Sequence, residues 1–121
     1  MLESYPFYYR FQFRDRECVV VHAGFKEGSF SREMDLENFY IYAREEAIQD
    51  GGIERGLIIS GHNPTIINGC VVYNKGKVFS YYDKEKDCRF FDIDCGSAYR
   101  ASNTNGKLAC IRLDDEEVFY F

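Results

Sequence analysis

Two short apolar stretches, each followed by a histidine, decide the fold of this chain. They are Val19-Val20-Val21-His22-Ala23-Gly24 and Leu57-Ile58-Ile59-Ser60-Gly61-His62. Unbroken apolar runs of this length are typical of strands that are buried on both faces. Residues directly after such strands lie at the sheet edge where α/β proteins bind ligands. Because imidazole is the commonest metal ligand among side chains, we expect His22 and His62 to share a metal. The alternative is two structural histidines, and two are too few for a complete site.

The remaining sequence predicts one α+β domain that spans residues 1–121 and is rich in strands. The length suits a single domain, and 11 Phe and 10 Tyr favour strands. Alternation, short apolar runs and turn residues between them are the signals for each strand. The expected strands are residues 8–14, 18–21, 57–60, 70–73, 78–81, 90–94, 108–113 and 118–121. Residues 70–81 and 108–121 read as hairpins.

One amphipathic helix is predicted over residues 36–48. Its apolar positions recur at helical spacing; they are Leu36, Phe39, Tyr40, Ala43 and Ala47. Asp35 is the expected N-cap. The helix is expected to end at Asp50-Gly51-Gly52.

Composition excludes several classes of protein. The net charge of −5 disfavours a nucleic-acid partner, since phosphate backbones are bound by clustered Lys and Arg. No apolar run reaches the roughly 18 residues of a membrane span, so no membrane partner is expected. Five cysteines without a CxxC spacing indicate free thiols in a reducing cytoplasm rather than a disulfide framework or a zinc knuckle.

The two histidine stretches also resemble known motifs. His22-Ala23-Gly24 and Gly61-His62-Asn63-Pro64-Thr65 are similar to the HAG and GHTPT motifs of the calcineurin-like metallophosphoesterases. The closer resemblance is to the bacterial and phage serine/threonine phosphoprotein phosphatase branch, which includes symmetrical dinucleoside-tetraphosphate hydrolases. HAG alone is unspecific, but further stretches resemble the family in the same order; they are residues 2–8, 41–46, 91–96 and 107–114.

The resemblance implies a fold and a site. The family fold is a two-sheet α/β/β/α sandwich, and this chain would form its C-terminal half, a strand-rich mixed sheet with one main helix. His22 and His62 would bind the second ion of a binuclear divalent metal centre, containing manganese or iron and zinc. Arg44 would hold a phosphate oxygen, a task that suits its planar fork. The alternative for Arg44 is a solvated charge paired with Glu45 or Glu46.

Asp92 and Asp94 share one strand face at i, i+2 spacing. The resemblance gives their strand a structural role. We therefore do not expect these two carboxylates to belong to the site.

The resemblance also implies an incomplete site. The family's GDxHG, GDxxDRG and GNH motifs are absent from these residues, and they supply the first metal's ligands, the bridging Asp and the general acid. We therefore expect a fragment that is inactive alone. An open apolar sheet face would pair with an N-terminal half or with a second copy.

Three functions follow as expectations. The first is hydrolysis of phosphorylated proteins or small phosphoesters in the complete enzyme. The second is symmetrical dinucleoside-tetraphosphate hydrolysis, which the loops at residues 25–35 and 83–89 would distinguish from the first. The third is a non-catalytic domain that binds a partner through its open face.

Overall fold

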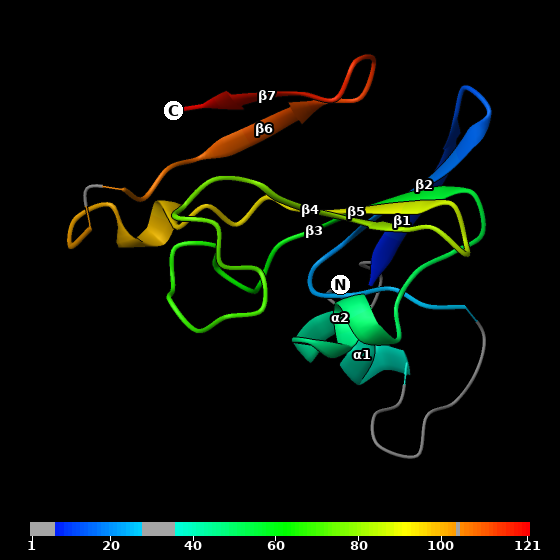
Figure 1. Ribbon diagram of the computed structural model, residues 1–121, viewed down its shortest axis with the longest axis horizontal. Helices are drawn as coiled ribbons and strands as arrows, with labels where there is room; N and C mark the ends of the chain where they lie inside the picture. The colour runs from blue at the N-terminus through cyan, green and yellow to red at the C-terminus, as the bar shows by residue number, and fades with distance from the viewer. Residues whose placement is uncertain (1–6, 28–35, 104) are drawn as a thin grey trace, which may run out of the picture.

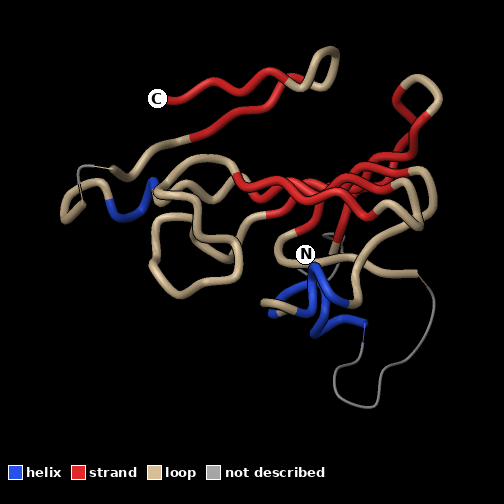
Figure 2. Tube along the Cα trace, in the orientation of Figure 1, coloured by secondary structure: helices blue, strands red, loops and turns tan. Residues whose placement is uncertain are grey.

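The computed structural model describes residues 7–27, 36–103 and 105–121. Figures 1 and 2 show a mixed sheet with two short helices on one side and a separate β-hairpin on the other. The predicted α+β class is therefore confirmed. The predicted N-cap Asp35 lies outside the described residues, as do most of the 2–8 stretch and part of the 25–35 loop.

The sheet is built around the two apolar runs. Its strand order is β1-β2-β3-β5-β4, in which β2, β3 and β5 are parallel and β1 and β4 are antiparallel edges. Every residue of the central strand β3 is buried, as predicted for its apolar run. The same prediction is wrong for the run in β2, because Val20 is 38% exposed. The five strands are β1 (Tyr8–Phe13), β2 (Arg16–Val21), β3 (Gly56–Ser60), β4 (Phe79–Asp83) and β5 (Cys88–Asp92).

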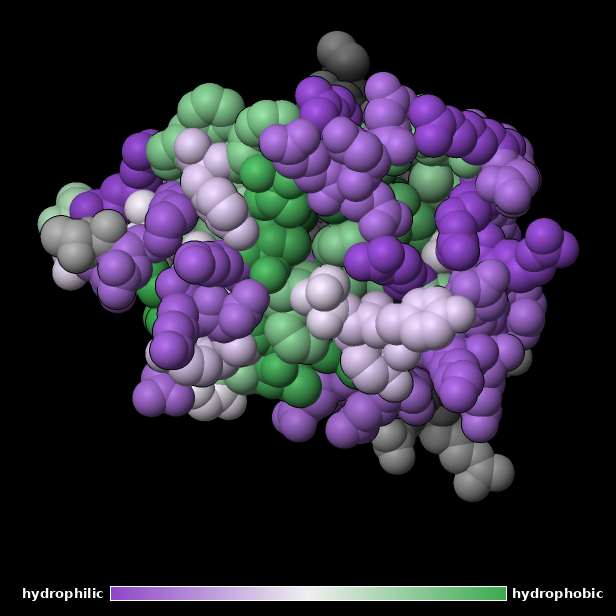
Figure 3. All heavy atoms as spheres, turned by 45° about the horizontal axis from the view of Figure 1, so that its top comes forward, coloured by the Kyte–Doolittle hydropathy of each residue, from purple (hydrophilic) through white to green (hydrophobic). Residues whose placement is uncertain are grey.

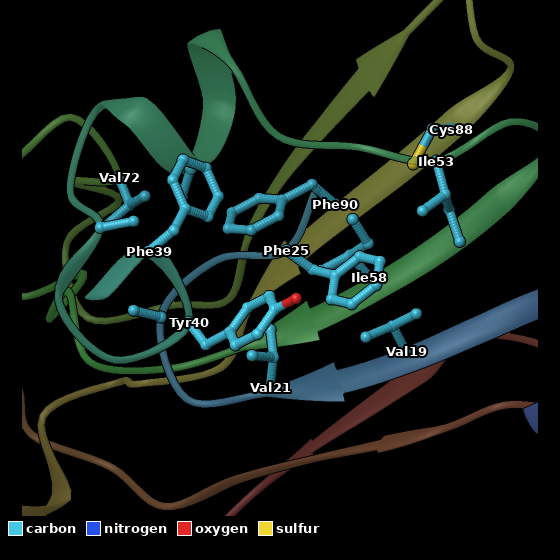
Figure 4. Close-up of a cluster of buried hydrophobic side chains, with 13 residues drawn as sticks. Val19, Val21, Phe25, Phe39, Tyr40, Ile53, Ile58, Val72, Cys88 and Phe90 are labelled. Carbon is cyan, nitrogen blue, oxygen red and sulfur yellow. The ribbon is translucent and has the colours of Figure 1, made fainter. Parts of the chain in front are cut away.

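Helices α1 (Leu36–Tyr42) and α2 (Glu46–Gln49) cover one face of the sheet. Figure 4 shows side chains from β2, β3 and β5 meeting those of α1 in one apolar cluster. Phe39, Tyr40, Ala43 and Ala47 are all buried in it, so the predicted core side of the helix is confirmed. No helix in the described ranges is long and apolar enough to cross a membrane.

The prediction of one continuous helix over residues 36–48 is wrong, because the chain breaks between Tyr42 and Glu46. A helix passing through this point would use the Tyr40 carbonyl to accept the Arg44 N–H. That carbonyl instead accepts the N–H of Ala23 at 2.8 Å. The Arg44 N–H donates to the Glu46 carboxylate at 2.8 Å. A hydrogen bond from the loop after β2 therefore replaces one hydrogen bond of the helix.

A hairpin of β6 (Ala109–Arg112) and β7 (Glu117–Tyr120) lies over the other face, as predicted for the C-terminal residues. Ile111 and Leu113 pack against the second core cluster, which consists of Cys18, Leu57, Ile59 and Phe91. Figure 3 shows an apolar band on this side of the molecule.

The predicted hairpin of residues 70–73 with 78–81 is wrong. Residues 61–78 form turns, in which the Thr65 carbonyl accepts the N–H groups of Asn74 and Gly76 at 2.8 and 3.2 Å. β4 pairs instead with β5, through the charged turn that follows Asp83. The predicted strand at 90–94 begins and ends two residues earlier, as β5. Residues 70–73 form turns and no strand, so the outer edge of β4 has no partner strand within the described residues.

Candidate functional site

The parallel pairing of β2 and β3 brings the two histidines together. Val20 is in register with Ile59, so the loops after both strands leave the same edge of the sheet. His22 Nε2 lies 2.9 Å from His62 Nδ1, and the ring centroids are 4.7 Å apart. The Gly61 N–H donates to the His22 carbonyl at 2.9 Å, which ties the two loops together. Their juxtaposition is thus observed, while metal binding stays a prediction.

His62 occupies an unusual position. Its φ is +68°, a left-handed conformation that costs free energy for any residue with a Cβ and recurs at functional sites. Burial, followed by the nearby His22 and Arg44, lowers the pKa of the His62 imidazole. The ring is therefore neutral at physiological pH, which is the form that binds metals. Its Nε2 is buried and has no hydrogen-bond partner among the described residues.

Gly24 explains why the loop after His22 needs a small residue. A Cβ at this position would lie 2.9 Å from the Ala47 Cβ and 3.0 Å from the Phe39 ring. Only glycine lets the loop pack this closely on both helices. Close packing in turn brings the Ala23 N–H to the Tyr40 carbonyl and fixes where the exposed His22 emerges.

Arg44 stands in the break between α1 and α2 and is exposed. One guanidinium nitrogen, Nη1, donates to Asn63 Oδ1 at 3.2 Å. The Glu46 carboxylate accepts the backbone N–H of Arg44, so it does not serve as the ion-pair partner considered above. Among the described residues the guanidinium forms no ion pair, and its remaining N–H groups are available to an anion.

Asn63 is the residue whose importance the sequence did not reveal. It is 2% exposed, and its Nδ2 donates to the Ala43 carbonyl at 2.9 Å while its Oδ1 accepts from Arg44. An amide can do both because it carries a donor and an acceptor. As the direct neighbour of His62, it links the second histidine to the arginine. In the sequence, Asn63 differs from the Thr that follows the histidine in the GHTPT motif, and this difference alone indicates no role for it.

The histidine pair fits part of a metal centre. Two imidazole nitrogens that are each about 2.1 Å from one ion lie about 3.0 Å apart at right angles and about 3.4 Å apart in a tetrahedral site. The observed 2.9 Å between His22 Nε2 and His62 Nδ1 is a hydrogen-bond distance, and it is close to the right-angle spacing. No cluster of three or more His, Cys, Asp or Glu in the described part of the chain could hold an ion. These residues therefore fit two ligands of one ion, and further ligands are needed.

The end of β5 and the loop after it carry two acidic side chains, Asp92 and Asp94. Asp92 is fully buried, and burial raises the pKa of its carboxyl to about 8. Its Oδ1 accepts the Asp94 N–H at 2.9 Å, and Asp94 Oδ1 accepts the Gly96 N–H at 3.2 Å. Both carboxyl groups thus accept hydrogen bonds from the backbone of the loop after β5.

No family model, curated protein or solved structure matches this chain.

Proposed function

We propose that this chain supplies the C-terminal half of a metal-dependent phosphoester hydrolase similar to the phosphoprotein phosphatases. His22 and His62 hold a divalent cation, and Arg44 binds a phosphate of the substrate. The supporting observation is the 2.9 Å approach of His22 Nε2 to His62 Nδ1, beside a guanidinium that Asn63 tethers to the same loop.

Each side chain has a role that its chemistry suits. A divalent cation at the two imidazoles would polarise a phosphoryl oxygen. Manganese, or iron with zinc, suits such ligands, which do not choose sharply among these metals. Arg44 uses Nη1 on Asn63 and keeps its other donors for a phosphate oxygen. It would orient the phosphate in the complete enzyme, since a planar guanidinium meets phosphate oxygens at two points.

A second candidate function is partner binding without catalysis. Tyr9, Phe11 and Val20 are 63%, 38% and 38% exposed. They lie on the same sheet face as the second core cluster, because Phe11 is in register with Cys18 and Tyr9 with Val20. Contiguous exposed apolar side chains mark interaction surfaces. An N-terminal half of the same fold, or a second copy, is the partner that would also complete the metal site.

We also propose a reducing compartment, the cytoplasm. All five cysteines are free thiols, and Cys18, Cys88 and Cys95 are buried. Buried thiols without disulfide partners are typical of proteins in such compartments.

Manganese binding tests the metal part of the proposal. The chain has only two histidines, so paramagnetic broadening of their ring signals can be followed without ambiguity. We expect substoichiometric Mn²⁺ to broaden both signals first. His22→Ala or His62→Ala should each weaken binding by about tenfold or more, since loss of even an outer-shell partner of a metal ligand costs about 10–100-fold.

The control for this titration is Asp114→Asn, an exposed carboxylate in the β6–β7 turn, which should leave binding unchanged. If the acidic turns broadened before the histidines, or if either His→Ala variant bound Mn²⁺ like the wild type, the metal site would be refuted.

A further inference from the structure

A hollow of about 320 Å³ opens beside Arg44. Its lining combines one guanidinium, one amide, one carboxylate and an apolar wall; the residues are Arg44, Glu45, Asn63, Gly69, Cys70 and Val71. Its volume lies at the small end of the range for sites that take small organic groups, about 300–1,000 Å³. A phosphoester whose phosphate is bound by Arg44 would therefore place its organic group next to this hollow.

We propose that the hollow receives the organic group of the substrate and selects an aromatic one, as in a phenolic phosphate such as phosphotyrosine. This inference rests on the proposed function, because it assumes that Arg44 binds the phosphate. It adds the substrate class, which the histidines and the arginine do not determine.

The charges of the lining match one phosphate. Among the described residues around the hollow, Arg44 is the one cation and Glu45 the one carboxylate. A single guanidinium can pair with one phosphate group, whose remaining negative charge would be left to a cation at the histidines. A carboxylate beside the guanidinium disfavours additional anions. A chain of four phosphates would need several cations here. The lining therefore favours a phosphomonoester over a dinucleoside tetraphosphate.

The part of the lining formed by residues 69–71 is apolar, and hydrogen bonds hold its backbone in place. Val71 is 44% exposed, while its neighbour Val72 is 1% exposed and anchors the segment in the core. The turn is closed by the Cys70 N–H to Ile67 carbonyl bond at 3.2 Å and by the Tyr73 N–H to Cys70 carbonyl bond at 3.0 Å.

Gly69 completes this wall. Its φ of +100° favours glycine, and a Cβ there would meet nothing within 4 Å. The wall is thus free of a side chain at this point, so a flat ring can approach Val71. An ethyl group, or the short stem of a phosphoserine, would leave most of this apolar surface in water.

The test compares three probes on the full chain by NMR titration of amide signals: phenyl phosphate, ethyl phosphate and inorganic phosphate. Burying roughly 60 Å² more apolar surface should make phenyl phosphate bind about tenfold more tightly than ethyl phosphate. Val71→Ser should reduce that preference to about threefold or less and leave the affinity for inorganic phosphate unchanged. Leu108→Ser, at an exposed apolar residue that does not line the hollow, should change neither.

The outcomes separate this inference from the function on which it rests. If all three probes bind equally and Arg44→Gln abolishes binding of each, the aromatic site is refuted and the phosphate site stands. If no probe binds, or Arg44→Gln binds them as the wild type does, both are refuted. Tighter binding of diadenosine tetraphosphate than of phenyl phosphate would also overturn the aromatic site.

Discussion

At the scale of single residues, Asn63 connects the two halves of the candidate site. Its amide bridges the Ala43 carbonyl and the Arg44 guanidinium from a position 2% exposed. Such a bridge restricts the arginine and so reduces the entropy lost when phosphate binds. In the proposed function, Asn63 would therefore be a positioning residue that acts on the phosphate through Arg44.

The first prediction concerns Asn63→Ala. It should lower the free energy of unfolding by about 1–3 kcal/mol, because the buried Ala43 carbonyl loses its donor. Phosphate affinity should fall about fivefold as Arg44 becomes free to rotate, while Mn²⁺ binding at the histidines persists. Urea denaturation and NMR titration would measure the two effects. Asn74→Ala is the matched control, because this exposed amide donates to the Val78 carbonyl in the same loop, at 2.8 Å. Equal phosphate affinities in both variants would contradict the positioning role.

The second prediction concerns the buried carboxyl of Asp92, whose pKa is raised to about 8 by burial. In the unfolded chain the same group ionises near its ordinary value of about 3.9. Between these values the folded state holds one more proton, so the free energy of unfolding falls as pH rises. The fall is at most about 1.4 kcal/mol per pH unit. Asp92→Asn should remove this part of the slope between about pH 5 and 8 in urea denaturation.

The control for Asp92 is Asp115→Asn. The Arg112 side chain lowers the pKa of the Asp115 carboxyl to about 2, so its titration lies below the range measured. The Asp115→Asn slope between about pH 5 and 8 should therefore equal that of the wild type. A slope in Asp92→Asn as steep as the wild type's would show that Asp92 is already ionised in the folded protein.

At the scale of elements, the loops after β2 and β3 differ in how closely they pack. A Cβ at Gly24 would meet three side-chain atoms at 2.9–3.1 Å, whereas one at Gly61 would meet none closer than 3.7 Å. The third prediction is that Gly24→Ala lowers the free energy of unfolding by about 1–3 kcal/mol through overpacking. Gly61→Ala should keep a free energy of unfolding within about 0.5 kcal/mol of the wild type's. Thermal and urea unfolding would compare them. Comparable losses in both would mean that helix packing does not account for the first glycine.

The elements also show what the sequence could predict. The apolar runs that became β2 and β3, and the buried positions of the helical stretch, follow from local periodicity. The break in the helix does not, because a tertiary hydrogen bond from Ala23 takes the Tyr40 carbonyl. The stretch 70–73 has strand composition but forms turns beside Thr65. At the site, strand ends predicted the meeting of His22 with His62. The side-chain bond from Arg44 to Asn63 joins residues 19 positions apart and has no local signal.

At the scale of the whole molecule, the chain is built from three layers: the helices, the mixed sheet and the β6–β7 hairpin. Together these layers bury two core clusters. The sheet edge after β2 and β3 carries the histidine pair, and the face beside β1 leaves Tyr9, Phe11 and Val20 exposed. The fold can therefore form a stable core while the proposed metal site still lacks ligands.

The last prediction is that this chain alone does not hydrolyse an aryl phosphate such as p-nitrophenyl phosphate in the presence of Mn²⁺. His22 and His62 are the two ligands that the described residues bring together, and two imidazoles leave an ion without the bridging carboxylate of a two-metal site. Release of p-nitrophenol should equal that of His62→Ala, which removes one ligand. Arg44→Gln, which keeps both histidines, should give the same background rate. Turnover that exceeds the His62→Ala rate would show that these residues assemble a working site unaided, alone or in a self-associated form. Sedimentation of the active sample would then distinguish those two cases.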